Sequence, residues 1–206
     1  MDLSDVIANR RMTRDFSPRK IPRELIISAC KLALTSPTAG NCRGVEMLIL
    51  SDKRSLAVFW ESSTSTQWRE KSGESGVKRS PVIVIPLYNT EKYIKRYRLD
   101  DKANSALYKK TADQWEVPFW ITDASFAVMT LLLAAQNYGL GALFFQLHQP
   151  QRKVLDSLCV PNDYATLGAV ALGYANTHGS AKIPPDVLDE RLLPSAYDAR
   201  IHVDSW

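Results

Sequence analysis

The chain has 206 residues, of which 45% are hydrophobic and 23% charged, with a formal net charge of +4. This length predicts one domain, residues 1–206, and the composition is ordinary for a soluble globular protein. The charge is too small to indicate nucleic-acid binding by itself. Three scattered cysteines and three histidines lack the spacing of a disulfide framework or a metal site. We expect no metal. Because Met1-Asp2 is not followed by a cationic and apolar leader, we also expect no signal peptide and a cytoplasmic protein.

Three arginines follow the first expected helix, which Ser4 can cap. If that helix continues, Arg10 and Arg14 share a face at i, i+4, with Arg11 beside them. Guanidiniums at this spacing repel each other unless an anion lies between them, and a phosphate accepts forked hydrogen bonds from arginine. Three solvated charges remain the alternative interpretation of this pattern.

A run of small and turn-forming residues, 36–41, follows a second helix that is expected to begin near Pro22 and end near Thr35. The run precedes an expected strand at residues 45–50. Such a segment offers backbone amides for close approach to a flat ligand, although most runs of this kind are only turns.

The middle of the chain predicts a short helix at residues 52–59, a long surface excursion at 61–79 and a buried strand at 81–87. Residues 89–98 place tyrosines among basic residues, a pattern that can bind nucleic acid. A tyrosine stripe under a solvated cationic face explains them equally well, so we expect no nucleic-acid partner. Residues 100–120 are a candidate lid.

The most distinctive stretch is an expected helix in which, between residues 124 and 135, only Ser125 and Thr130 are polar. A helix that is apolar on every face must be buried on every side. Either Thr122 or Asp123 is the expected N-cap, and Gly139 is an expected left-handed C-cap. The run is too short and too polar at its flanks for a membrane span. We therefore expect a helix in the core or between two subunits, and no membrane partner.

The remaining chain predicts a strand at residues 142–147, a short helix at 150–158 and a strand at 166–173, followed by an irregular tail. About four core strands alternate with helices, without the regular order of a doubly wound sheet. Neither a Gly-x-Gly-x-x-Gly nor a P-loop motif occurs. If the protein holds a phosphate, side chains must bind it.

Six short motifs, in this order along nearly the whole chain, resemble the nitroreductase family of FMN-dependent NAD(P)H oxidoreductases. They are Arg10-Arg11-x-x-Arg14-x-Phe16, the run at 36–41, Ser80-Pro81 before a strand, Asp123 opening the apolar helix, Gly139-Leu140-Gly141 and Gly173-Tyr174. The resemblance implies an α+β fold with three layers. In that fold a mostly antiparallel sheet of four to five strands is flanked by helices, with one long central helix buried.

The resemblance also implies which residues hold the flavin. The 36–41 run would come from the second subunit of a homodimer with active sites at the interface. A backbone amide at the end of the 142–147 strand, at Gln146 and Leu147, would face N5 of the flavin ring. Two departures are that Met12 replaces the usual Ser, and that Cys42-Arg43-Gly44-Val45 follows Asn41 where the family often has x-Gln-Pro-Trp. The expected cofactor-binding residues are Arg10, Arg11, Met12, Arg14, Ser36, Pro37, Thr38, Ala39, Asn41, Gln146, Leu147 and, late in the chain, Lys182 and Arg191.

The function implied is transfer of a hydride from NADH or NADPH through FMN to a nitroaromatic, a quinone or a similar conjugated acceptor, by a ping-pong mechanism. No catalytic side chain is required, because the flavin carries the chemistry. Arg14, or less favourably Lys20, would stabilise the reduced, anionic flavin. The alternative is a non-catalytic protein of the same fold that sequesters FMN, since Leu147 stands where relatives often have Gly and would narrow the space above the ring.

Overall fold

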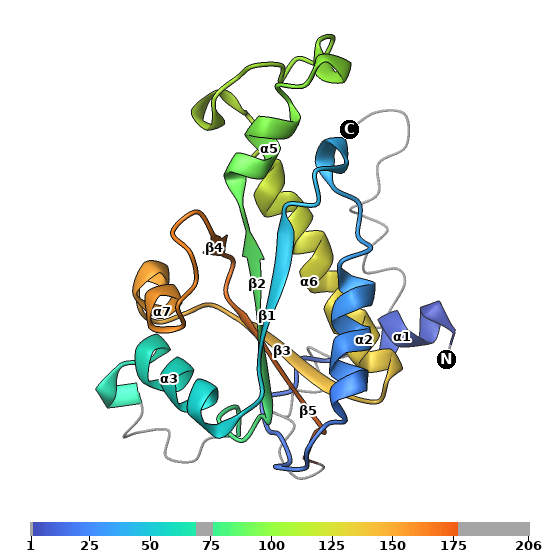
Figure 1. Cartoon of the computed structure of the whole chain (residues 1–206). Helices are drawn as coiled ribbons and strands as arrows, with labels where there is room; N and C mark the ends of the chain where they lie inside the picture. The colour runs from blue at the N-terminus through green and yellow to red at the C-terminus, as the bar shows by residue number, and fades with distance from the viewer. Residues whose placement is uncertain (1, 69–75, 177–206) are drawn as a thin grey trace, which may run out of the picture.

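The computed structural model describes residues 2–68 and 76–176, and its centre is an antiparallel five-stranded sheet (Figure 1). The antiparallel pairing of the strands confirms the predicted α+β fold. Its strands, in spatial order, are β1 (Val45–Leu50), β2 (Val82–Tyr88), β5 (Ala169–Gly173) and β3 (Gly141–Phe145), and the short β4 (Ala165–Thr166) pairs with β2.

Successive side chains of β2 point to opposite faces of the sheet. Both faces are apolar, and helices cover each of them. Val82 and Val84 pack beneath α2 (Arg23–Ala33) and α6 (Phe119–Asn137). Ile83 and Ile85 pack on the other side, against α3 and α7. The bounds of those helices are Lys53–Ser63 for α3 and Gln151–Ser157 for α7. The three predicted layers are therefore present, and Figure 1 shows the two helix pairs on either side of the strands.

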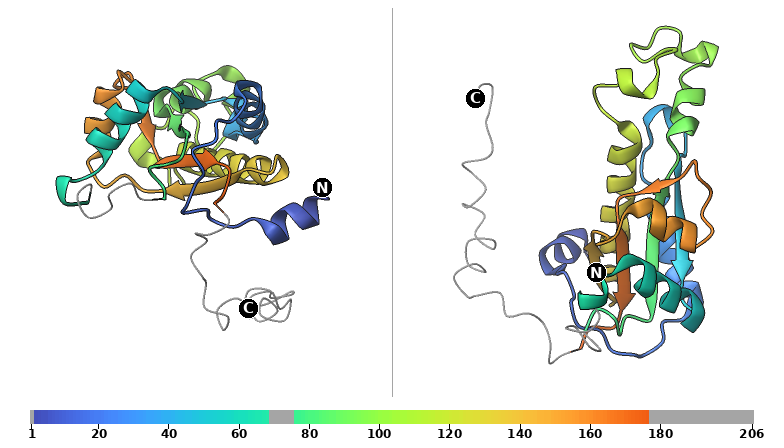
Figure 2. Two further views of the ribbon diagram at one scale, coloured as in Figure 1. Left: turned by 90° about the horizontal axis from the view of Figure 1, so that it is seen from below. Right: turned by 90° about the vertical axis from the view of Figure 1, so that its left-hand side faces the viewer.

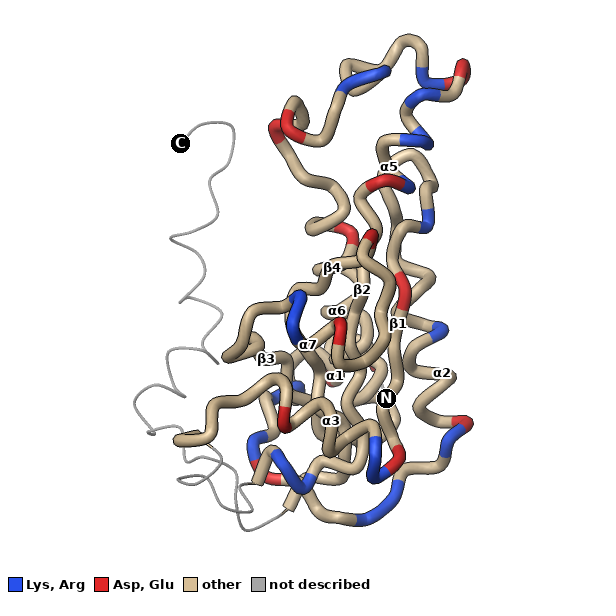
Figure 3. The backbone as a smooth tube through the Cα atoms, turned by 60° about the vertical axis from the view of Figure 1, so that its left-hand side comes forward, with Lys and Arg blue, Asp and Glu red and all other residues tan. Residues whose placement is uncertain are grey.

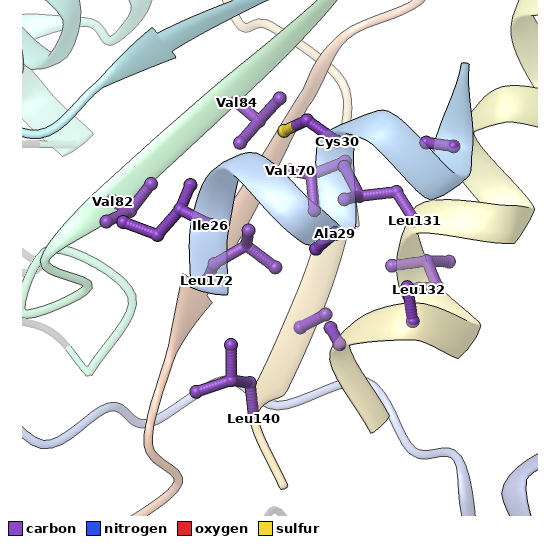
Figure 4. Close-up of a cluster of buried hydrophobic side chains, with 14 of the residues drawn as sticks. Ile26, Ala29, Cys30, Val82, Val84, Leu131, Leu132, Leu140, Val170 and Leu172 are labelled. Atoms are coloured by element: carbon purple, nitrogen blue, oxygen red, sulfur yellow. The ribbon is translucent and has the colours of Figure 1, made fainter. Parts of the chain in front are cut away.

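The contact between α2 and α6 forms the larger of the two cores (Figure 4). Ala29 and Cys30 of α2 lie between the strands and Leu131 of α6. Burial raises the pKa of the Cys30 thiol to about 11, so this thiol is protonated at neutral pH and behaves as a small apolar side chain.

The helix α6 begins earlier than the sequence predicts. Its N-cap position is Pro118, so the prediction that Thr122 or Asp123 caps the helix is wrong, and Asp123 lies in the second turn. The first turn is aromatic and packs into a separate cluster that includes Trp120, and this tertiary contact extends the helix. The predicted end is confirmed, since Gly139 has φ of +69° and Leu140 N donates to Ala135 O at 2.8 Å.

Not every face of α6 is covered within one chain. Leu131 and Ala135 are fully buried, but Phe126 is 46% exposed and Met129 is 43% exposed. Among the described residues, α6 is the helix long and apolar enough to cross a membrane, and half of that window is buried inside the fold. The helix is thus a core helix with one apolar strip on the surface.

The N-terminal helix α1 (Leu3–Asn9) is capped by Asp2 rather than by Ser4, and it ends before the arginines. Arg10 is already extended, with φ of −61° and ψ of 125°. The prediction that Arg10 and Arg14 share one face of a continuing helix is therefore wrong. Pairing with a sheet edge replaces the helix, because Met12 forms a parallel bridge with Ala142. Figure 2 shows α1 standing beside α6 at one margin of the molecule.

Two other boundaries differ from the sequence prediction. The helix α3 continues to Ser63, and Ser62, Ser63 and Thr64 are buried, so the expected surface excursion does not begin at residue 61. The late strand expected at 166–173 is divided into β4 and β5 at Gly168, whose φ of +146° suits glycine.

Beyond the end of the sheet, α5 (Thr90–Arg96) and the start of α6 form an aromatic cluster with Trp115. The rings of Tyr97 and Trp115 meet edge to face at 5.0 Å. Basic residues of this region have acidic partners: Lys92 pairs with Glu46 at 2.6 Å, and Arg96 pairs with an aspartate. Figure 3 shows the resulting mixture of signs around α5 rather than a continuous cationic face.

Truncation of the sheet centre tests this packing. Ile83 is fully buried on β2, so Ile83→Ala is expected to lower the free energy of unfolding by about 2–5 kcal/mol. The matched control is Leu99→Ala, at a residue that is 54% exposed, where a change within about 0.5 kcal/mol is expected. Urea unfolding curves measure both, and equal losses would contradict the assignment of β2 to the core.

Candidate functional site

Residues 10–16, called the arginine segment below, run in extended form along the beginning of β3. The strand β3 lies at an edge of the described sheet. Thr13 N donates to Ala142 O at 2.9 Å. Arg10 Nη1 is buried and has no hydrogen-bond partner among the described residues. Arg11 turns back, its Nη1 donating to Ala8 O at 2.6 Å, whereas Arg14 is exposed.

Phe16 anchors the far end of this segment. Its ring is fully buried in the core between the sheet and α3, and its backbone N donates to Gly76 O at 3.1 Å. The neighbouring Asp15 forms an ion pair with Arg79. These contacts fix the path of the arginine segment independently of any ligand.

Met12 occupies the position where the family pattern has Ser. Its side chain is partly buried and packs against both main core clusters. It therefore offers no hydroxyl to a ligand and serves instead as a second anchor of the arginine segment.

The 36–41 loop is held by two helices. Ser36 Oγ lies 2.8 Å from Thr130 Oγ1 of α6, and the Ala39 amide donates to Asp123 Oδ2 at 2.8 Å. Gly40 O accepts a hydrogen bond from Arg96 Nε of α5 at 2.7 Å. Asp123 is only 3% exposed, so this carboxylate acts on the loop rather than on the helix terminus.

The loop contains two consecutive left-handed residues, Gly40 with φ of +62° and Asn41 with φ of +54°. A Cβ on Gly40 would lie 2.9 Å from the ring of Tyr97, so glycine is needed for space as well as for conformation. Arg43 Nε donates a long hydrogen bond, 3.5 Å, to Oδ1 of Asn41, and both of these residues are exposed.

The departure at Cys42-Arg43-Gly44 has a structural reason. A Cβ at residue 44 would lie 2.2 Å from the ring of the fully buried Tyr93, so only glycine fits there. Burial raises the pKa of the Tyr93 hydroxyl, helped by the nearby Asp123 carboxylate, and burial also raises the pKa of the Cys42 thiol. Both groups are neutral supports beneath the loop.

A hollow of about 200 Å³ opens beside the loop. Arg43 is the described cation that lines it, and its backbone N donates to Thr38 Oγ1 at 3.1 Å. Sequence reasoning missed Arg43, Tyr93 and Arg96 as parts of this region; the only signal was the unusual Cys-Arg-Gly sequence after Asn41. The lining residues are Ala33, Leu34, Ser36, Thr38, Arg43, Val45, Asp123 and Ala127.

Gln146 and Leu147 directly follow β3. Gln146 is exposed, whereas Leu147 is buried in the cluster that contains Phe59 and Leu143. Because the Leu147 side chain packs into the core, it does not stand free in front of the strand. This placement weakens the reason for expecting a blocked flavin ring.

The structure does not bring all the predicted site residues together within one chain. The 36–41 loop contacts α6 at Asp123 and Thr130, whereas the arginine segment lies at the start of β3, just beyond the other end of that helix (Figure 1). The rise from Asp123 to Asn137 is about 21 Å. Lys182 and Arg191 lie outside the described residues.

The family model described as the Nitroreductase family matches residues 7–174. This chain belongs to the nitroreductase family. The predicted family is therefore confirmed, and the chain is an oxidoreductase.

Among nitroreductase-family relatives, a Methanothermobacter thermautotrophicus protein named, provisionally, as an NADH dehydrogenase/NAD(P)H nitroreductase is 24% identical, over 100% of this chain and 88% of its own length. Two solved structures share the fold. An FMN-dependent nitroreductase from Clostridium difficile R20291 has a TM-score of 0.67 at 21% identity, covering 98% of this chain and 99% of its own. The gut-bacterial enone reductase CLA-ER has a TM-score of 0.71 at 22% identity, covering 92% and 96%.

Asp123 gives a test of the loop support. Asp123→Ala leaves the partly buried Ala39 amide without its acceptor, which is expected to lower the free energy of unfolding by about 1–3 kcal/mol. Asp123→Asn keeps a carbonyl acceptor at this position and is expected to lose less. Thermal unfolding compares the two with Asp113→Ala, an exposed control. Equal stability of all three variants would contradict the role assigned to Asp123.

Proposed function

We propose that this nitroreductase-family protein is an FMN-dependent oxidoreductase that takes a hydride from NADH or NADPH. FMN, when bound, would supply the redox chemistry by which the hydride reaches a conjugated acceptor, such as a nitroaromatic or a quinone, in a second half-reaction. The observation that carries the proposal is Arg10 Nη1, buried without an acceptor beside an edge strand in a chain of this family. The solved FMN-dependent nitroreductase of the same fold supports the choice of cofactor.

The arginine segment fits a phosphate group. A buried guanidinium N–H without an acceptor is costly, and a phosphate oxygen at Arg10 Nη1 would remove that cost. The exposed Arg14 is available on the same extended segment. Because the segment is anchored by Phe16 and paired with Ala142, little reorganisation is needed to bind the anion.

The edge strand β3 leads from that phosphate position to the proposed ring position. Gln146 lies four positions after Ala142, which is about 14 Å along an extended strand. An edge strand leaves backbone groups unpaired, and amides at Gln146 and Leu147 are suited to hydrogen-bond a flat heteroaromatic ring. An elongated cofactor with a phosphate at one end can thus lie along β3, with Arg14 or Lys20 supplying positive charge.

We also propose that the protein is a homodimer with active sites shared between the chains. The uncovered strip of α6, with Phe126 and Met129, borders a surface hollow of about 450 Å³ that reaches Ser36 and Pro37. A two-fold contact through this strip would bury it and extend the loop of one chain toward the partner. A dimer of this kind would bring together the predicted site residues that lie at opposite ends of α6 within one chain.

The rival function is flavin sequestration without turnover. It is tested by adding NADH or NADPH to the purified, FMN-saturated protein under nitrogen and following the visible flavin absorbance. The proposed enzyme bleaches within turnover time and regains its colour when a quinone is added. A yellow protein that keeps its colour with both nucleotides would overturn the proposed reaction and favour sequestration.

Arg10 gives the most direct test of the phosphate position. Loss of a hydrogen bond to a charged group costs about 1.5–3 kcal/mol, so Arg10→Ala is expected to raise the Kd for FMN by roughly 10- to 150-fold. Arg14→Ala is expected to weaken binding in the same direction. Fluorescence titration of free FMN measures the change.

The matched control is Arg54→Ala on α3, another exposed arginine, outside the proposed site. Its Kd for FMN is expected to be unchanged. If Arg10→Ala and Arg14→Ala, both folded by circular dichroism, bind FMN as the wild-type protein does, the phosphate assignment is wrong.

Subunit mixing tests the shared site. Arg14→Ala and Asn41→Ala each disable a different half of every site, so each homodimer is expected to be nearly inactive. After dissociation and reassociation of equal amounts, half of the dimers are mixed and each has one intact site, which restores roughly a quarter of the wild-type activity. Verified subunit exchange without any recovery would contradict sites built from two chains.

A further inference from the structure

The chain between α5 and α6, residues 97–118, is called the arm below and has no part in the proposed flavin site. Figure 1 and Figure 2 show the arm extending beyond the end of the sheet. It contains two short 3₁₀ helices, Asp100–Lys102 and Ala112–Gln114. Most of this stretch is the candidate lid of the sequence analysis, and its base lies against the 36–41 loop.

Arg96, the last residue of α5, joins the arm to that loop. Its Nε donates to Gly40 O at 2.7 Å, while its Nη1 and Nη2 donate to Oδ1 and Oδ2 of Asp101 at 2.7 and 2.6 Å. The forked bonds from Arg96 hold the pKa of Asp101 below its ordinary value, and Lys102 Nζ lies 3.9 Å from the same carboxylate. Because a forked pair fixes the plane of the guanidinium, Asp101 also sets the direction in which Nε meets Gly40.

The bond to Gly40 O reaches the central peptide of a tight turn. Cys42 N closes this turn on Ala39 O at 3.3 Å, and both central residues are left-handed, with φ of +62° at Gly40 and +54° at Asn41. Two left-handed central residues define a type I′ turn. Rotation of the Gly40–Asn41 peptide would give a type II′ turn, which favours glycine at the first central position and needs only that residue to be left-handed. The Gly-Asn sequence therefore suits both turns.

Two hydrogen bonds hold the central peptide in the observed orientation. Asn41 N donates to Thr38 O at 2.8 Å, and Gly40 O accepts from Arg96 Nε. The first bond lies within the loop, whereas the second comes from α5 and depends on the pairing with Asp101. Rotation of the peptide would break both bonds and turn the carbonyl away from a guanidinium. The contact with Arg96 therefore favours the type I′ turn.

We propose that Arg96 is a positioning residue: paired with Asp101 of the arm, it fixes the Gly40–Asn41 peptide and so sets how the 36–41 loop meets its ligand. The arm thereby acts on the loop without being part of it. The identity of that ligand, FMN, rests on the proposed function, whereas the effect of the arm on the loop does not.

Asp101→Asn tests the coupling from its far end. Asp101 is exposed, and exposed substitutions are ordinarily close to neutral, so the Tm is expected to stay unchanged. Hydrogen exchange is followed by mass spectrometry on the full-length protein, without added FMN, in the peptide that covers residues 38–43. Exchange there is expected to become about 1.5- to 5-fold faster, the range for loss of an exposed ion pair. The Kd for FMN, from fluorescence titration, is expected to rise by a similar factor.

Arg96→Ala removes both ends of the contact. It is expected to accelerate exchange in the same peptide, and to raise the Kd for FMN, by about tenfold or more, the effect of a hydrogen bond to a charged group. Since Asp101 acts through Arg96, adding Asp101→Asn to Arg96→Ala is expected to cause no further change in either measurement.

Two matched controls separate this coupling from general effects of changing the arm. Asp101→Glu keeps a carboxylate for Arg96 and is expected to retain wild-type exchange and FMN binding. Asp100→Asn removes the adjacent exposed carboxylate, which has no ion pair in the part of the chain that the structure describes, and it is expected to change neither quantity.

Unchanged loop exchange in Asp101→Asn would overturn the proposal, and so would a full further loss when Asp101→Asn is added to Arg96→Ala. If exchange follows the expected pattern but every variant binds FMN as the wild-type protein does, Arg96 positions the loop and the assignment of FMN to that loop is wrong. If the Kd for FMN rises while loop exchange stays at the wild-type rate, the flavin site stands and the role of Arg96 is wrong.

Discussion

The packing of α6 against the sheet is the constraint on which the rest of the structure depends. Its buried face, with Leu131 and Ala135, fixes the helix over β2 and β5. Its second turn then presents Asp123 to the 36–41 loop, while Gly139 ends it where β3 must begin. One helix therefore sets both the support of the loop and the place where the arginine segment pairs, about 21 Å apart.

Each half of the proposed flavin site is rigid for a different reason. The arginine segment is held by backbone pairing with an edge strand and by the buried ring of Phe16. The loop has two left-handed residues, Gly40 and Asn41, whose types suit that conformation, and contacts with Asp123 and Arg96 hold it in place. Because several contacts fix each segment, a ligand that binds there needs to cause little change in its conformation.

The sequence was most informative where a pattern is decided locally. A run of β-branched residues located β2, and Gly139 located the end of α6, because strand packing and a left-handed cap leave direct marks in the sequence. The family followed from six weak motifs in a consistent order.

The errors arose where distant contacts decide the local structure. Aromatic packing around Trp120 carries α6 back past Asp123, and pairing with Ala142 ends the first helix before Arg10. The stacking of Trp60 with Trp68 and Phe145 had no local signal in the sequence. Trp60, Trp68 and Phe145 meet only because α3 and β3 are brought together across the sheet, and nothing in their spacing along the chain indicates it.

The central claim is that two chains jointly hold FMN, and native mass spectrometry of the purified protein tests it most directly. The account predicts a dimer that carries up to two FMN molecules, and monomers, released by dilution, that have lost the flavin. A monomer that retains FMN as firmly as the dimer would contradict it, because one chain would then contain a complete site.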